Sequence, residues 1–124
     1  MVQLLREALS EAPYRALTCH AQVLLNQVAS STNPALAKDE LDFMRNRASC
    51  DFVLYFKVGK TPLGVIEVDG GSHDRPEQAT RDALKNSILA KSDIPILRLR
   101  TIESHIEEKI DGFLAQWASS VANV

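Results

Sequence analysis

Two short runs of strand-forming residues, separated by a polar turn, constrain this chain more than any other feature. The runs cover residues 52–56 and 63–66, and the turn between them contains Gly59 and Pro62. Aromatic and β-branched residues bounded by Gly, Lys and Pro are typical of a β-hairpin. One carboxylate precedes the first run and two more end the second. We therefore expect three acids at the end of the hairpin that lies away from the turn.

The three acids are Asp51, Glu67 and Asp69. They share a face only in some registers, because a shift of one residue reverses the face of every side chain. A loop with an odd number of residues places Asp51 opposite Asp69 and puts all three acids on one face. A two-residue Gly-Lys turn instead places Asp51 opposite Val68, with the other two acids pointing away. Pro62 fits the wider loop better, so we predict the register that gathers the acids.

A cluster of acids at the end of an apolar strand predicts a metal site. Val65, Ile66 and Val68 indicate a strand that is buried on both faces. A buried carboxylate needs a partner or a cation, and oxygen-only ligands suit Mg²⁺ or Mn²⁺. The alternative, that each acid is a solvated residue at a strand end, stays open.

The rest of the chain predicts helices on both sides of a short mixed sheet. Periodicity predicts helices at residues 1–12, 77–91 and 101–118, and strands at residues 18–25 and 94–100. Residues 35–44 fit either a short helix or an irregular segment. This order predicts an α/β sandwich of three layers, with a parallel, right-handed crossover from the second hairpin strand to the last strand.

Length and composition limit the classes of protein to which the chain can belong. The chain of 124 residues predicts a single domain over residues 1–124. A net charge of −2 means that contact with nucleic acid must come from a local basic patch. Two cysteines, far apart and without metal-ligand spacing, suit the reducing cytoplasm, and no apolar run is long enough to cross a membrane.

Four motifs in a fixed order resemble those of the PD-(D/E)XK nuclease superfamily. They are Cys50-Asp51-Phe52-Val53-Leu54, Ile66-Glu67-Val68-Asp69-Gly70-Gly71-Ser72-His73, Arg81-Asp82-Ala83-Leu84-Lys85 and Ile94-Pro95-Ile96-Leu97-Arg98. More narrowly, the chain resembles a small bacterial branch of that superfamily. Its relatives include the very-short-patch repair endonucleases and an uncharacterised domain that is often fused to helicases or topoisomerases. The resemblance covers residues 48–100. It implies a three-layer restriction-endonuclease-like αβββαβ core, with a mixed central sheet and a C-terminal helix.

The resemblance also implies a set of metal ligands and a catalytic cation. Asp51, Glu67, the backbone carbonyl of Val68 and Asp69 would hold Mg²⁺ or Mn²⁺. Asp69 stands where the superfamily has the lysine that orients the attacking water. In this branch the positive group is expected from the following helix. The candidates are Lys85 and, one turn earlier on the same face, Arg81, although both also fit ordinary solvated residues of a helix.

Three further residues complete the predicted site. His73 would contact the phosphate or transfer a proton, or would only end a turn. Arg98 and Arg47 would contact nucleic acid. Alternatively, Arg98 would pair structurally with Asp82 or Glu103, and Arg47 would be a solvated loop residue. The function implied is metal-dependent phosphodiester hydrolysis in DNA, favoured over RNA, in repair, restriction or defence. The alternative is a catalytically inactive module that binds nucleic acid or a protein partner. A homodimer or a partner domain is compatible with both.

Overall fold

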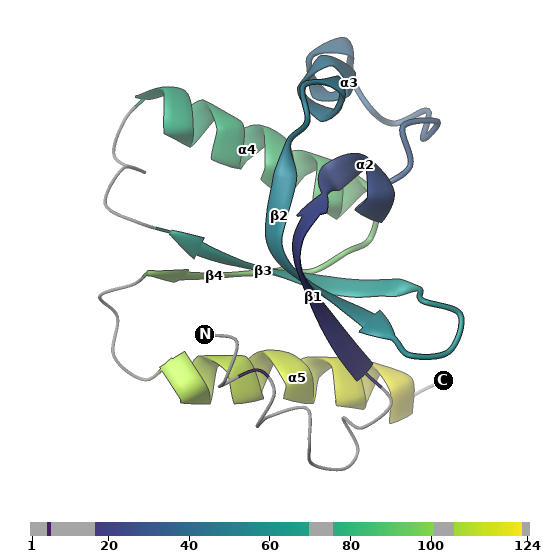
Figure 1. Cartoon of the computed structure of the whole chain (residues 1–124), viewed down its shortest axis with the longest axis vertical. Helices are drawn as coiled ribbons and strands as arrows, with labels where there is room; N and C mark the ends of the chain where they lie inside the picture. The colour runs from purple at the N-terminus through teal and green to yellow at the C-terminus, as the bar shows by residue number, and fades with distance from the viewer. Residues whose placement is uncertain (1–4, 6–16, 70–75, 101–105, 123–124) are drawn as a thin grey trace.

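A four-stranded sheet lies between two layers of helices in a computed structural model that describes residue 5 and residues 17–69, 76–100 and 106–122 (Figure 1). The strands are β1 (Leu17–Leu24), β2 (Ser49–Phe56), β3 (Pro62–Asp69) and β4 (Ile96–Arg100), and the helices are α2 (Leu25–Val28), α3 (Lys38–Arg45), α4 (Pro76–Lys91) and α5 (Ile106–Ala122).

The sheet is mixed, and its strand order is β1-β2-β3-β4. The first three strands pair antiparallel, and β3 pairs with β4 in parallel after the chain has crossed over through α4. The three-layer α/β architecture, the mixed sheet and the parallel crossover are therefore confirmed. The segment at residues 35–44, left open by the sequence, contains most of α3. The helix expected at residues 1–12 lies outside the described residues, apart from Leu5.

The predicted pairing of the hairpin is wrong, although two of the three acids, Asp51 and Glu67, share a face as predicted. Four residues, 57–60, form the turn, and the amide of Phe56 donates to the carbonyl of Thr61 at 3.1 Å. If the register set by this turn continued along both strands, Asp51 would pair with Ile66. Asp51 and Glu67 would then lie on opposite faces of the sheet. A bulge between Leu54 and Tyr55 shifts the register by one residue.

After the bulge, Phe52 pairs with Ile66 and Val53 with Val65. One further step places Asp51 opposite Glu67, not opposite Asp69 as predicted. Because opposed residues share a face, Asp51 and Glu67 point to the same side of the sheet. The bulge therefore decides that the two acids meet.

Alternation along the strands sorts apolar side chains into one core on each face. Val53 and Val65 pack with Ile88 and Leu89 of α4 and with residues of α2 and α3. On the other face, Leu54, Ile66 and Leu99 pack with Ile110 and Leu114 of α5, as the opposite positions of α4 and α5 in Figure 1 suggest. Glu67 lies two residues after Val65 and so projects toward α4. Within the described residues, none of the helices combines the length and apolarity needed to cross a membrane.

Candidate active site

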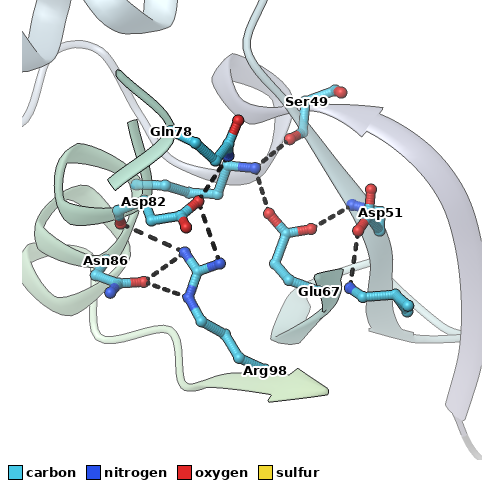
Figure 2. A network of polar contacts seen from close by, with 9 residues as sticks. Ser49, Asp51, Glu67, Gln78, Asp82, Asn86 and Arg98 are labelled. Carbon is cyan, nitrogen blue, oxygen red and sulfur yellow. Dashed lines mark hydrogen bonds and ion pairs between the residues drawn. The ribbon is translucent and has the colours of Figure 1, made fainter. Parts of the chain in front are cut away.

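At the end of the hairpin, the Asp51 and Glu67 carboxylates each accept a hydrogen bond from a backbone amide of the other's strand. The Asp51 amide donates to Glu67 Oε2 at 2.7 Å, and the Val68 amide donates to Asp51 Oδ2 at 2.8 Å. Each carboxylate thus replaces a carbonyl as the acceptor for the backbone of the neighbouring strand. These two bonds fix both side chains at the point where β2 and β3 separate (Figure 2).

Lys85 of α4 supplies the positive charge at this site. Its Nζ forms an ion pair with Glu67 Oε1 and also donates to the Ser49 carbonyl at 2.7 Å. Only 15% of the Lys85 side chain and 4% of the Glu67 side chain are exposed to solvent. The ion pair therefore connects α4 to β3 in a nearly water-free setting, where charges interact strongly.

Burial dominates the electrostatics of Glu67. It raises the pKa of this carboxyl above its ordinary value of 4.5, against the opposing effects of the Lys85 ammonium and the Asp51 amide. The neighbouring thiol of Cys50 is fully buried, and burial together with the negative charge of Glu67 raises its pKa to about 12. A thiol with so high a pKa stays protonated at neutral pH, which makes Cys50 an inert packing residue.

A second set of contacts attaches α4 to β4. The Arg98 guanidinium donates to Asn86 Oδ1 from Nε at 3.1 Å and from Nη2 at 2.8 Å. It also reaches the Asp82 carbonyl at 3.3 Å and lies 3.4 Å from Asp82 Oδ1. Gln78 donates to that same Asp82 oxygen at 3.0 Å. Glu67 and Arg98 are paired neighbours on β3 and β4, so two adjacent side chains of the sheet hold the same helix (Figure 2).

An open cleft of about 460 Å³ runs beside these contacts, between α3, the start of β2 and α4. Asp51 and Lys85 line it together with Arg47 and Arg81. Asp51 Oδ1 has no hydrogen bond to any of the described residues, so one oxygen of this acid is available to a ligand in the cleft. The arrangement combines a carboxylate acceptor with several cations on the walls of one cavity.

The family model of DUF2726, described as a protein of unknown function, matches residues 2–116. The chain belongs to the DUF2726 family. No curated protein and no solved structure matches it. The match covers both hairpin strands, α4 and β4, so every described residue of the candidate site lies within the family's extent.

The structure brings together most of the residues that the sequence predicted for this DUF2726 chain. Asp51, Glu67 and Lys85 meet, and Arg81 and Arg47 line the same cleft. Of the other predicted positions, Val68 is described but acts through a different atom, whereas two are described in part or not at all. Val68 uses its amide to hold Asp51, His73 lies outside the described residues, and Asp69 is described only by its backbone pairing with Arg100.

The contacts of Arg98 differ from the nucleic-acid contact that the sequence predicted for it. Its guanidinium is engaged by Asp82 and Asn86, which agrees with the structural alternative that the sequence left open. Sequence reasoning missed Gln78 and Asn86. Their spacing of four residues from Asp82 was the available signal, since residues four apart share a helix face.

Two carboxylates, not three, converge in the described part of the site. Among the described residues of this DUF2726 chain, no group of three or more His, Cys, Asp and Glu side chains could hold a metal ion. The residues that fit a hard divalent cation are Asp51, through its available Oδ1, and Glu67, through an oxygen now bound by Lys85. Carboxylate oxygens are the ligand type that Mg²⁺ and Mn²⁺ prefer.

Proposed function

We propose that this DUF2726 chain is a metal-dependent phosphodiesterase of the PD-(D/E)XK type, with a restriction-endonuclease-like core, that acts on nucleic acid. The observation that supports this most is the meeting of Asp51 and Glu67 from paired strands with Lys85 from the next helix. Asp69 replaces the strand lysine of that superfamily. The contact between Lys85 and Glu67 supports the idea that α4 supplies the missing cation.

Each residue of the site has a distinct part in this proposal. Asp51 and Glu67 would hold Mg²⁺ or Mn²⁺, and the metal would supply polarisation of the phosphodiester and favour ionisation of water. Lys85 lies within reach of the carboxylates and would stabilise the negative charge that develops on the phosphate. Arg81, exposed on the cleft wall one turn before Lys85, would bind a phosphate oxygen.

A non-catalytic module that binds nucleic acid is the second candidate. It is favoured by the ion pair itself, because Lys85 already neutralises Glu67 without a metal. The two candidates differ in their response to a divalent cation. The enzyme requires the metal for turnover, whereas the binding module does not need it.

The test compares Mn²⁺ binding and nucleic-acid cleavage in the parent, Asp51→Asn and Glu67→Gln. We expect the parent to bind Mn²⁺ in calorimetry and to cleave a panel of DNA and RNA oligonucleotides only when the metal is present. Both variants should lose cleavage while their circular dichroism spectra stay unchanged. Asp42→Asn is the matched control, since Asp42 is a half-exposed acid on α3 that does not line the cleft. Cleavage by both site variants at the parent's rate would exclude these acids as the active site. No Mn²⁺ binding by the parent would favour the binding module.

A further inference from the structure

Two arginines of the cleft have no ion-pair partner among the described residues. Arg47 follows the end of α3, Arg81 lies on α4, and both are exposed while lining the cavity of about 460 Å³. The other described arginines with a known contact differ from them. Arg45 pairs with Asp42 outside the cleft, and Arg98 is bound by α4. Unpaired guanidinium groups beside a carboxylate site are suited to binding the oxygens of a phosphate.

The backbone of Arg47 is compatible with a binding role, although Gln22, Lys60 and Asp93 share its positive φ outside the cleft. The φ of 62° at Arg47 lies in the left-handed region, and this residue directly follows Asn46, the residue that caps the C-terminus of α3. That position after a helix is usually glycine, because residues with a Cβ are strained there. Strained backbone of this kind is concentrated at binding sites. Arg47 is thus an unfavourable residue for its backbone and a suitable one for an anion.

The walls that carry the arginines are tied together. Glu40 of α3 is buried, forms an ion pair with Lys91 of α4 and accepts a hydrogen bond from the Ala37 amide at 2.8 Å. This link sets the distance between the two helices before any ligand binds. The cleft is therefore preformed, which lowers the entropic cost of binding.

The depth of Lys85 limits which nucleic acid reaches it. Lys85 lines the cleft and has 15% of its side chain exposed, so a phosphate contacts its ammonium group only from inside the cleft. A cavity of about 460 Å³ is the size of a small-molecule pocket and accepts about one nucleotide. A stacked duplex is wider than a single nucleotide, so it lies across the mouth of a cavity of this size and does not enter it. An unpaired segment can, because its backbone follows a basic groove one nucleotide at a time.

We propose that this cleft binds an unpaired nucleotide segment, with Arg47 and Arg81 on its phosphates, so that the substrate of the proposed phosphodiesterase is single-stranded nucleic acid. This inference rests on the proposed function for its catalytic consequence. The binding itself requires only the cleft and its two arginines.

The test is fluorescence anisotropy with a labelled oligonucleotide of about 12 residues, single-stranded or annealed to its complement, in EDTA so that no cleavage occurs. We expect the single strand to bind about tenfold more tightly than the duplex. Arg47→Gly and Arg81→Gln should each weaken single-strand binding about fivefold. Each should also reduce the slope of log K against log salt by about 0.7, as expected for one lost phosphate contact on a single strand.

Two features make the variants informative. Glycine accepts the left-handed φ of residue 47, so Arg47→Gly removes the cation without disturbing the fold, and its melting temperature should equal or exceed the parent's. Arg45→Gln removes the same charge two residues earlier, outside the cleft, and should change neither affinity nor slope.

Equal affinity for duplex and single strand would overturn the inference. Parent-like affinity of Arg47→Gly and Arg81→Gln for the single strand would also overturn it, as would no binding of the parent to single strand or duplex. The same measurements distinguish a failure of the proposed phosphodiesterase activity from a failure of the proposed single-strand binding. Single-strand binding that depends on Arg47, without cleavage in Mn²⁺, would refute the activity and retain the binding site. Metal-dependent cleavage with equal affinity for both forms would retain the activity and refute the substrate class.

Discussion

Lys85→Met removes one member of the buried ion pair at the candidate site, and its cost follows from the burial of Glu67. Loss of one partner of a buried pair costs about 3–5 kcal/mol when the other charge stays buried. Solvent screens this pair little, since the exposed fractions are 15% and 4%. Glu67 keeps its bond from the Asp51 amide and is able to take up a proton, which favours the lower end of the range. We expect a loss of about 3 kcal/mol in the free energy of unfolding at about pH 8.

The pH dependence of that loss has a definite sign. Burial already raises the pKa of Glu67 above 4.5, and removal of the Lys85 ammonium raises it further. A folded state with the raised pKa is stabilised by protonation. That stabilisation is fully present below the unfolded pKa of 4.5 and is lost as the pH rises through the folded value. Lys85→Met should therefore lie closest to the parent at about pH 5 and furthest from it at about pH 8.

Urea unfolding of a double-mutant cycle at both pH values measures the coupling. Glu67→Gln removes the charge, so the double variant should recover part of the stability that Lys85→Met loses at about pH 8, with a coupling energy of about 2 kcal/mol. Lys57→Met, at an exposed lysine of the hairpin turn, is the control and should change stability by less than about 0.5 kcal/mol. The reasoning would be refuted by a loss of equal size at both pH values, or by a coupling energy near zero.

Three further predictions concern the supports of the site. Arg98→Met removes the guanidinium that holds α4 and should lower the free energy of unfolding by about 2 kcal/mol in urea titrations; an unchanged midpoint would contradict this role. Gly64→Ala would bring a Cβ within 2.9 Å of the Phe113 ring and should destabilise by about 1–3 kcal/mol, whereas Gly112→Ala meets open space on α5 and should stabilise by about 0.5–1 kcal/mol. Thermal melts that rank the two alanine variants in the reverse order would disprove this packing. Hydrogen bonding from the Ala37 amide, followed by that from Lys91, lowers the pKa of Glu40 to about 2, so the stability that this carboxylate contributes should be lost as the pH falls from 4.5 toward 2. The free energy of unfolding of Glu40→Gln should therefore depend less on pH than that of the parent over this interval. The same pH dependence in both proteins would exclude the effect.

Much of the fold was readable from local patterns. Alternating and continuous apolar runs predicted the four strands, and the stripe along residues 77–91 predicted α4, because side-chain periods of 2 and 3.6 depend only on neighbouring residues. The same locality placed Asp51 and Glu67 at strand ends and Lys85 on the following helix. The resemblance to PD-(D/E)XK nucleases rests on these positions, and that identification and its metal remain predictions.

The tertiary structure decided which of these groups meet. A single bulge between Leu54 and Tyr55 sets Asp51 opposite Glu67, and the hydrophobic pattern does not reveal it because residues 52–56 are all apolar or aromatic. The partners of Arg98 likewise depend on the distance between β4 and α4, which local propensity does not determine. The sequence by itself thus determined the elements and the chemical groups they carry. Only long-range packing decided that Lys85 binds Glu67, that Arg98 holds α4, and that Arg47 and Arg81 line the cleft without an ion-pair partner among the residues that the structure describes.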